Sequence, residues 1–397
     1  MGTSCRETHL CLPFYLLKGG ENMIKSFKIR LELNNKQTSL LFGCAGTGRW
    51  AYNFALSKIQ EHYKETGKFL NDGEIRKQLT QLKQNDENYK WLYKYSNNIT
   101  KQAIKDACDA YKRFFKGLSK FPKFKSKKKS KPSFYNDTFK IKFTSTHVQL
   151  EKIGKIKLSE RDRMLQGKYY NPRITFDGVD WYLSIGVEVE DNIKPVLTDI
   201  KLGIDVGVKD LAIVSNGTKY KNINKSRQVK KLEKKLRRLQ RKVSKKYQMN
   251  KQDKKFIKTN NIKKLEVEIK KVYKRLTNIR TDYIQKVTTE IVKPKPSQIV
   301  METLNIGGMM KNKHLSKAIQ QQKLYEFKTL LKYKSIRNGI KFIEANKWYP
   351  SSKTCSKCGY IKPKLSLGER EFVCESCGCI IDRDLNAAVN LSRYKIV

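Results

Sequence analysis

Acidic residues, histidines and long apolar runs are all scarce in this sequence. The 397 residues include 37 Asp and Glu against 85 Lys and Arg, which leaves a formal charge of +48. Such a charge opposes compaction unless a polyanion neutralises it, so nucleic acid is the expected partner. An anionic membrane is the weaker alternative, because no segment approaches the ~20 apolar residues that are needed to span a bilayer. We therefore expect no membrane partner.

The nine cysteines lack the pattern of a secreted disulfide framework. Two Cys-x-x-Cys pairs with fifteen residues between them have the spacing of a tetrahedral zinc site, with the ligands Cys355, Cys358, Cys374 and Cys377. The other five cysteines are scattered: Cys5, Cys11, Cys44, Cys108 and Cys379. Zinc sites of this type are four-coordinate, so Cys379 is interpreted as a packed core residue. This cysteine usage fits a reducing cytosol, and we expect a cytoplasmic protein.

The first 22 residues differ in character from the rest of the chain. Their short apolar run, Leu10 to Leu17, has neither the basic flank nor the cleavage site of a signal peptide. The segment Lys18-Gly19-Gly20-Glu21-Asn22, directly before Met23, has a sequence that a purine-rich ribosome-binding site would encode. Our hypothesis is that Met23 is the native start and that residues 1–22 are a translated leader. An intact mass that includes residues 1–22, measured on protein from the native locus, would contradict it.

Periodicity predicts strands on both sides of a helical segment in the N-terminal half. Apolar residues alternate with charged ones from Phe27 to Leu33, which is typical of a half-buried strand. The pattern is helical and aromatic from about 37 to 118. Alternation returns from about 133 to 190, including the set Phe139, Ile141 and Phe143 and a turn at Asp177-Gly178. These patterns predict a small barrel that a helical domain interrupts.

The helical segment and the linker after it combine aromatic and basic side chains. Most of the aromatics are interpreted as core, while those beside Lys and Arg have the alternative of stacking on bases. They are Trp50, Tyr52, Phe54, Trp91, Tyr93, Tyr95, Tyr111, Phe114 and Phe115. The linker from Lys116 to Lys131 is either a solvated loop or a phosphate contact, and its clustered lysines favour the second reading.

The C-terminal half begins a new unit at about Thr198. A strand, a turn and a second strand are predicted within 201–214, followed by two long helices with apolar stripes and basic outer faces. The stripes consist of Leu232, Leu236, Leu239 and Val243, and of Leu265, Ile269, Val272, Leu276, Ile279, Tyr283, Val287 and Ile291. A buried strand at 297–302, a helix at about 316–338 and a strand at 341–344 are predicted before the cysteines.

Three carboxylates share one kind of setting: Asp205 within an apolar strand, Glu302 at the end of another, and Asp384 at a helix start. A carboxylate in an apolar strand is costly unless it is paired, hydrogen-bonded or bound to metal. The alternative is that each acid pairs with one of the many lysines. Taken together, the three describe an RNase H-like core, where acids converge on two Mg²⁺ ions about 4 Å apart to hydrolyse a phosphodiester without a histidine base.

Two further acids compete for a place in this set. Asp382 precedes Asp384 in the triplet Asp-Arg-Asp, and one of the two has the alternative role of N-cap for a helix from Leu385 to Arg393. Asp210 is interpreted as a turn residue.

At these residues the chain resembles the TnpB (OrfB-type) proteins of bacterial insertion sequences, which are related to the compact type V CRISPR effectors. The motifs cover the C-terminal half strongly, while the opening KSFKIRLELN and the helical region match loosely. They are GIDVGVKDLAIVSNG at 203–217, IVMETLNI at 299–306, HLSKAI at 314–319, WYPSSKTCSKCG at 348–359 and CESCGCIIDRDLNAAVNL at 374–391.

The resemblance implies a multidomain α+β protein with a RuvC-like nuclease domain whose catalytic, magnesium-binding acids are Asp205, Glu302 and Asp384. It also implies a zinc-ribbon module that contacts the target nucleic acid. The expected domains are a wedge-type β-barrel (23–48 and 126–195), a helical recognition domain (49–125), the nuclease domain (196–347 and 380–397) and the zinc ribbon (348–379).

Members of this family are RNA-guided DNA endonucleases, in which base pairing reads the target and the protein contacts the backbone. We therefore predict a transposon-encoded, Mg²⁺-dependent endodeoxyribonuclease with structural Zn²⁺. Its partners would be a guide RNA from the element end and double-stranded target DNA. We expect a monomer that associates with the nucleoid when engaged.

Three alternatives remain open. A transposase would use the same acids for strand transfer, but the sequence shows no clear helix-turn-helix module. A non-catalytic RNA-guided regulator would be expected to lose the acids, which this chain retains. A miniature CRISPR effector is separated from the main prediction only by genomic context.

Overall fold

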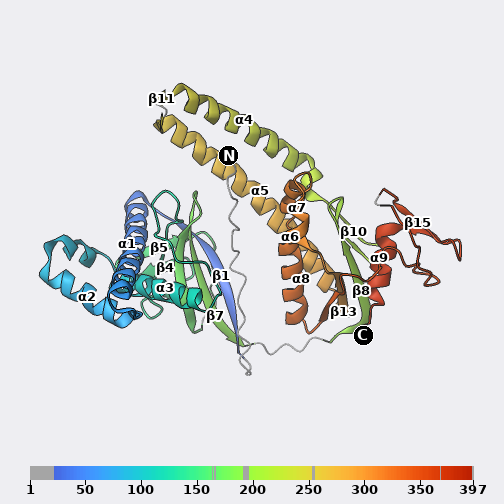
Figure 1. Cartoon of the computed structure of the whole chain (residues 1–397), viewed down its shortest axis with the longest axis horizontal. Helices are drawn as coiled ribbons and strands as arrows, with labels where there is room; N and C mark the ends of the chain where they lie inside the picture. The colour runs from blue at the N-terminus through green and yellow to red at the C-terminus, as the bar shows by residue number, and fades with distance from the viewer. Residues whose placement is uncertain are drawn as a thin grey trace. The chain divides into compact units, whose positions relative to one another are not determined.

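The computed structural model describes residues 22–162, 164, 167–190, 196–252, 255–366 and 368–395. The chain divides into two compact units, one that ends at residue 192 and one that begins at residue 193 (Figure 1). Apart from Asn22, the predicted leader lies outside the described residues.

The first unit contains a seven-stranded antiparallel sheet of order β2-β6-β7-β1-β5-β4-β3. Strand β1 pairs with β7 along most of its length and with β5 at its end, so it joins the two halves of the sheet. The strands are β1 (Asn22–Glu32), β2 (Ser133–Tyr135), β3 (Lys142–Phe143), β4 (His147–Leu150), β5 (Gly154–Leu158), β6 (Tyr169–Phe176) and β7 (Trp181–Glu190). No ladder among the described residues joins β2 to β3, so the sheet is observed as an open series.

The strand predicted around Phe139 is wrong in its first half. Only Lys142–Phe143 pairs as β3, and Phe139 lies in a turn with 92% of its surface exposed. Asp137 causes this, because its side-chain Oδ1 accepts the Phe139 N–H at 2.8 Å and gives the backbone an alternative to a strand ladder. The turn at Asp177-Gly178 is confirmed, with Gly178 at φ 99° and the Asp177 carboxylate accepting the N–H of Val179 and Asp180.

Helices form a second core in the first unit, as the periodicity predicts. They are α1 (Asn35–Thr66), α2 (Asp72–Asn85), the 3₁₀ helix η1 (Glu87–Lys94) and α3 (Asn97–Phe115). Asn34 and Asn71 start α1 and α2 with capping boxes. The N-terminal part of α1 packs in the core of the sheet and its middle packs with α2 and α3. A bidentate ion pair from Arg173 on β6 to Asp106 on α3, with both N···O distances 2.9 Å, fixes helix to sheet.

The aromatic side chains of this segment divide between core and surface. Tyr52 and Tyr111 are buried, whereas Trp91, Tyr93 and Phe115 are 42–56% exposed. The exposed Trp91 still packs edge-on against Trp50, with ring centroids 5.6 Å apart. Trp50 and Phe54 pack against the helical core, and Tyr95 packs against the core of the sheet. Five of the nine predicted rings therefore lie in a core or pack against one, and the prediction that most of them are core residues is confirmed.

The second unit is built on a mixed five-stranded sheet of order β10-β9-β8-β13-β14. Strands β8, β9 and β10 are antiparallel neighbours, whereas β8, β13 and β14 run parallel. Their bounds are β8 (Thr198–Val206), β9 (Asp210–Val214), β10 (Lys219–Lys221), β13 (Pro296–Glu302) and β14 (Lys341–Ala345). Asp210 begins β9 and is not a turn residue.

Helices pack on both faces of this sheet. One face packs against α5 (Asn260–Val292), α7 (Ser316–Gln322) and α8 (Leu324–Arg337), with Ile204 and Met301 among the sheet residues of that core. The opposite face packs against α9 (Arg383–Ser392), where Val300 and Leu391 meet. The smaller elements are η2 (Ile223–Lys225), β11 (Lys251–Gln252), β12 (Lys255–Phe256), α6 (Ile306–Met309), β15 (Glu371–Val373) and β16 (Ile380–Asp382).

The basic hairpin predicted from the two apolar stripes is confirmed. Helix α4 (Arg227–Met249) packs antiparallel on the N-terminal part of α5 through a small apolar core around Leu236 and Leu276. Figure 1 shows the pair extending away from the sheet of this unit. The C-terminal part of α5 belongs to the main core instead. Helix α5 therefore connects the hairpin to the sheet rigidly.

The single helix predicted at about 316–338 is observed as two. The chain breaks at Lys323, which has a left-handed backbone with φ 55°. Its ammonium group donates to Thr281 Oγ1 at 2.7 Å and pairs with Glu326, so tertiary contacts hold a conformation that costs a non-glycine residue about 1–2 kcal/mol.

Candidate active site and zinc site

The sheet register brings two of the predicted acids together. Met301 on β13 is paired with Ile204 on the parallel strand β8, so Glu302 and Asp205 follow side by side at the carboxyl ends of the two strands. Successive strand residues point to opposite faces. Because Ile204 and Met301 belong to the core beneath α5 and α8, Asp205 and Glu302 lie on the face that packs against α9.

The two carboxylates perturb each other strongly. Burial raises the pKa of Asp205 well above its ordinary value, and the charges of Glu302 and Asp384 raise it further. Burial also raises the pKa of Glu302, against the opposing effect of a hydrogen bond with Asp205. Both side chains keep partial exposure. Two hydrogen-bonded carboxylates must share a proton, because two adjacent negative charges repel each other.

Asp384 lies at the start of α9, close enough for its charge to act on Asp205. Its neighbour Asp382 is the N-cap: its Oδ1 accepts the N–H groups of Asp384 at 3.1 Å and Leu385 at 3.0 Å. The other oxygen of Asp382 accepts a hydrogen bond from Lys219 Nζ at 2.7 Å. Asp382 is thus used for capping and pairing, which leaves Asp384 as the acid of the triplet whose charge acts on Asp205.

Gly203, two residues before Asp205, allows α9 to lie directly on β8. A Cβ atom at this position would lie 1.9 Å from the Ala388 carbonyl oxygen and 2.3 Å from the Ser392 nitrogen. Both are backbone atoms of α9, so a side chain here would push the helix away. The predicted motif contains this glycine, but its role depends on a helix that lies far along the sequence.

We expect Gly203→Ala to destabilise the second unit by about 3 kcal/mol, because the new methyl group meets helix backbone and not a flexible side chain. Urea denaturation measures this. Gly207→Ala is the matched control, since the nearest atom to its added Cβ is the Asp210 carbonyl oxygen at an ordinary 3.6 Å. Equal midpoints for the two variants would rule out the close approach of α9.

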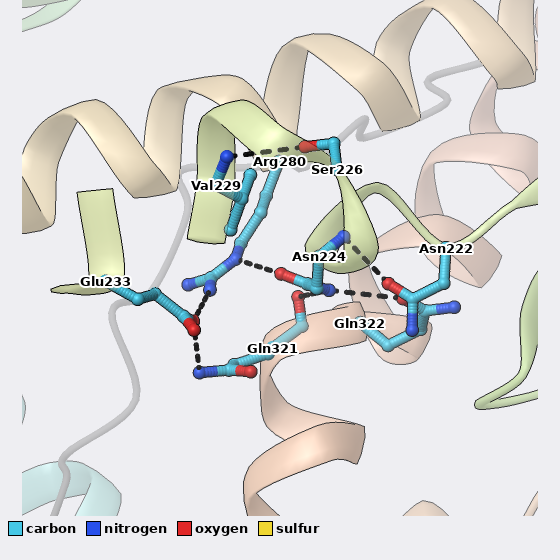
Figure 2. Close-up of polar contacts among 8 residues, drawn as sticks. All are labelled: Asn222, Asn224, Ser226, Val229, Glu233, Arg280, Gln321 and Gln322. Atoms are coloured by element: carbon cyan, nitrogen blue, oxygen red, sulfur yellow. Dashed lines mark hydrogen bonds and ion pairs between the residues drawn. The ribbon is translucent and has the colours of Figure 1, made fainter. Parts of the chain in front are cut away.

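Amide side chains hold the loop after Asp205, and Figure 2 shows the polar network to which these side chains belong. Gln322, which is 3% exposed, donates to the Gly207 carbonyl at 3.2 Å, and Asn222 donates to the Val208 carbonyl at 2.8 Å. Asn224 donates to Gln322 Oε1 at 3.3 Å. These bonds connect the loop beside Asp205 to α7 and η2.

Arg280 on α5 extends the network to the basic hairpin (Figure 2). Its Nε donates to Asn224 Oδ1 at 2.7 Å, and its guanidinium pairs with Glu233 on α4 at 3.2 Å. Gln321 also donates to Glu233 at 3.1 Å. The base of the hairpin is therefore fixed to the same loop region that follows Asp205. The sequence alone gave no signal for this network, because its members come from four separate elements.

Arg280→Ala is expected to lower the free energy of unfolding by about 2–3 kcal/mol, since it leaves Glu233 and Asn224 with unmatched polar atoms in a mostly enclosed site. Arg275→Ala, at an exposed position on the same helix, should change it by no more than about 0.5 kcal/mol. Thermal denaturation of both variants distinguishes the two effects. Similar melting temperatures for the two would show that the network contributes little.

The four predicted zinc ligands lie together. Their sulfur atoms are all within 4.8 Å of one another, and the closest pairs are Cys358–Cys374 at 3.5 Å and Cys355–Cys377 at 3.7 Å. Four sulfurs at about 2.3 Å from a tetrahedral zinc would be about 3.8 Å apart, so the cluster fits this ion. Within the described residues it is the one group of three or more potential ligands this tight, and Cys379 is not part of it.

Each Cys-x-x-Cys pair is followed by a glycine with a left-handed backbone. Gly359 has φ 81° and Gly378 has φ 67°. The N–H groups of these glycines bond back to the carbonyls of Cys355 and Cys374 at 2.9 and 3.1 Å. Each turn therefore directs its two thiols to the same side.

The fold and the sites define a multidomain α/β protein with a four-cysteine cluster that fits a zinc ribbon. Family models match three parts of the chain. "Probable transposase" of the OrfB IS605 type matches residues 184–313, "Cas12f1-like, TNB domain" matches 325–391, and a "Helix-turn-helix domain" of OrfB IS605 matches 23–68. The resemblance to the TnpB (OrfB-type) proteins is confirmed.

Relatives and one solved structure match nearly the whole chain. InsQ of Escherichia coli (strain K12) is 28% identical over 93% of this chain and 91% of its own length. A protein of Streptomyces pristinaespiralis is 29% identical over 92% of this chain and 88% of its own. Both carry names that provisionally describe RNA-guided DNA endonucleases. The Cas12f1 chain in a complex with sgRNA and target DNA has a similar fold, with a TM-score of 0.57, 15% identity, and coverage of 94% of this chain and 99% of that one.

The N-terminal family model is described as a helix-turn-helix, but the matched segment has a different structure. Residues 23–68 form strand β1 and the single helix α1, which runs without interruption from Asn35 to Thr66. A helix-turn-helix needs two helices joined by a short turn. Within residues 23–68 the described structure contains one helix, so it does not show the pair of helices that this description names.

Among the described residues, every helix is too short or too polar to cross a membrane.

Proposed function

We propose that this chain is an RNA-guided DNA endonuclease that hydrolyses phosphodiesters at Asp205, Glu302 and Asp384. The observation that carries this proposal is the contact between two partly exposed carboxylates at the carboxyl ends of β8 and β13, with Asp384 at the start of α9 close enough for its charge to act on Asp205. The mixed sheet of order β10-β9-β8-β13-β14, in which β8, β13 and β14 run parallel, supports the RNase H-like, or RuvC-like, core that we propose. The names of the relatives support nucleic-acid cleavage as the activity.

The acids would hold two Mg²⁺ ions, which activate water and stabilise the leaving oxygen. Their oxygen donors suit a hard cation, and their mutual repulsion favours exchange of the shared proton for metal. Asp205 and Glu302 are fixed by neighbouring strands, so their separation varies little. Asp384 is carried by a helix that Gly203 allows to approach, and Asp382 fixes the first turn of that helix.

The nucleic-acid partners are supported by the distribution of charge. Five basic residues of α4 line a groove of about 410 Å³: Lys231, Lys234, Arg237, Arg238 and Arg241. Such a row fits a phosphate backbone. We infer that the sheet of the first unit, an open series in the described residues, serves as the wedge-type domain and that its helices form a recognition domain. We also infer that the protein binds guide RNA and target DNA as a monomer at the nucleoid.

The test is Mg²⁺-dependent cleavage with a defined guide. RNA that co-purifies with the protein is sequenced, and a DNA duplex that matches its variable end is offered with Mg²⁺. Cleavage of the matched duplex, and none of a mismatched duplex or with EDTA, is the expected result. Random co-purified RNA or no cutting of the matched duplex would overturn the proposal.

A transposase is the second candidate, because one family model carries the description "Probable transposase". Strand transfer would use the same acids. An integration assay with purified protein, element ends and no guide RNA separates the two functions, since only a transposase would join DNA ends under these conditions.

We also propose that Trp348 stacks on an unpaired base near the cleavage site. Ala345 is in register with Glu302 on the adjacent strand, and the turn Asn346–Tyr349 follows directly at the same sheet edge. Trp348 is 82% exposed in this turn, with Lys347 Nζ 4.9 Å from its ring centroid. An exposed ring beside a cation suits single-stranded nucleic acid.

Trp348→Ala is expected to lower the cleavage efficiency about 10-fold, because stacking contributes about 1–3 kcal/mol per base. Trp348→Phe should keep most of the activity, since it retains a ring. Tyr325→Ala, which removes an aromatic ring that is 63% exposed on α8, is the control. Cleavage under single-turnover conditions measures all three. An unchanged rate for Trp348→Ala would exclude the stacking role.

A further inference from the structure

Helix α9 carries two asparagines that are almost completely buried. Asn386 is 0% exposed and Asn390 is 4% exposed. Burying an amide is costly unless each polar atom finds a partner. The two residues are four positions apart, so they lie on one side of the helix.

The partners of both asparagines belong to the segment that contains the first zinc ligand. Asn386 Oδ1 accepts the Ser356 N–H at 2.9 Å, and its Nδ2 donates to the Thr354 carbonyl at 2.7 Å. Asn390 Nδ2 donates to the carbonyls of Thr354 at 2.6 Å and Ser351 at 2.8 Å. Cys355 stands between Thr354 and Ser356, so these bonds hold the backbone on both sides of a zinc ligand.

The second half of the zinc ribbon reaches the same helix through the chain itself. Strand β16 pairs with β15 and continues without a loop into α9, and this hairpin spans the predicted domain boundary at 379/380. Arg393 adds a hydrogen bond from its guanidinium to the Ser356 carbonyl. Zinc bound by the four cysteines would therefore connect two segments: the one around Cys355, which is hydrogen-bonded to α9, and the hairpin that continues into α9.

Helical geometry connects these contacts to the third acid. Asp384 and Asn386 are two residues apart, or about 200° around the helix, so they face in nearly opposite directions. Ala388 and Ser392 share the side of Asp384 and lie against Gly203 on the sheet, while Asn386 and Asn390 face the ribbon.

We propose that Asn386 and Asn390 are positioning residues through which the zinc ribbon places Asp384 opposite Asp205 and Glu302. The inference rests on the proposed nuclease function, and it gives the ribbon a role in catalysis besides any contact with the target. Ribbon, α9 and sheet form a layered stack, in which loss of the ribbon contacts frees the helix to shift. A displacement of about 1 Å at a reacting centre costs about 100-fold in rate.

The experiment compares Asn386→Ala and Asn390→Ala with Val389→Ala, a half-buried position on the same helix outside these contacts. Zinc content, target affinity, single-turnover cleavage rate and the Mg²⁺ concentration for half-maximal rate are measured on the full chain with its guide. Each asparagine variant should keep its zinc and bind target within about 3-fold. It should cut about 100-fold more slowly and need at least about 5-fold more Mg²⁺. Val389→Ala should behave as wild type.

Amide hydrogen exchange of residues 383–392 gives a readout that does not depend on cleavage. Protection of α9 should fall in both asparagine variants and in the wild-type protein after zinc is removed, while protection of β8 is retained. Unchanged protection of α9 together with an unchanged Mg²⁺ requirement overturns the proposal. A loss of protection throughout the second unit also overturns it, because the asparagines would then be general stability residues. If zinc removal lowers the protection of α9 but the wild-type protein never cleaves DNA, the proposed function is rejected. The mechanical link between the zinc ribbon and α9 then remains in place.

Discussion

Asp205→Asn is expected to reduce DNA cleavage at least about 1,000-fold while guide RNA and target binding stay within a few-fold of wild type. The substitution keeps the shape of the side chain and removes one of the charges that would hold the ions, and each such electrostatic contribution supplies several kcal/mol to the transition state. Under the proposed function, phosphate contacts from basic residues elsewhere would dominate binding, so affinity should change little.

The same substitution should raise the thermal stability of the second unit in the absence of divalent cations. Burial and the charges of Glu302 and Asp384 already raise the pKa of Asp205, which means that its ionised form is disfavoured in the folded protein. Because the pKa of Asp205 is higher in the folded than in the unfolded protein, the carboxyl lowers the free energy of unfolding once the pH exceeds its ordinary pKa. The gain in stability from Asn should therefore be present at neutral pH and disappear in acid. Melting curves at pH 7 and pH 4 check this.

Asp382→Asn is the matched control. Asn caps a helix as well as Asp does, and the lost ion pair with Lys219 is exposed and worth little. This variant should cleave within about 3-fold of wild type, whereas Asp384→Asn should behave like Asp205→Asn. Retained cleavage in Asp205→Asn would remove that residue from the mechanism, and loss of cleavage in Asp382→Asn would show that the acids of the triplet are assigned in the wrong order.

Cys374→Ser is expected to lower the zinc content from about one ion per chain to none and to abolish cleavage. The apolar core of the ribbon is very small, with Phe372 as its one fully buried large side chain among the described residues. A core of this size does not fold alone, so the metal supplies the folding free energy, which is about 10–16 kcal/mol in zinc-finger peptides. Zinc analysis and hydrogen exchange of residues 371–382 measure the loss.

Cys379→Ser provides the control for this prediction. Cys379 is half-buried beside the cluster but lies outside the four-sulfur group. The variant should keep its zinc and most of its activity. Zinc retained at full occupancy in Cys374→Ser would contradict the four-ligand site, and zinc lost in Cys379→Ser would make that residue a ligand. Melting of the first unit should be the same in both variants.

The zinc ligands and the strand-borne acids could be predicted because their signals are local. Two Cys-x-x-Cys pairs form tight turns whose geometry is set within a few residues, and an acid in an apolar strand is conspicuous wherever that strand lies. The choice between Asp382 and Asp384 was not local. In the sequence, either residue could be the helix cap. Only the hydrogen bonds of Asp382 to the backbone of α9 and to Lys219 identify Asp382 as the cap.

Most of the incorrect expectations have tertiary or side-chain causes that periodicity does not register. The break at Lys323 depends on Thr281 and Glu326, one of which lies 42 residues earlier. The exposure of Phe139 follows from an Asp137 side chain that competes with the strand ladder.

By itself, the sequence predicted a polyanion partner, four cysteines at the spacing of zinc ligands, the amphipathic hairpin and the two strand-borne acids, because charge, ligand spacing and periodicity act over short distances. Only the tertiary structure decided that β8 and β13 are adjacent, that α9 lies on Gly203, and that two buried asparagines attach that helix to the zinc ribbon. These features depend on pairing between segments tens to nearly two hundred residues apart. Their stability comes from close packing and satisfied hydrogen bonds, which no single segment encodes.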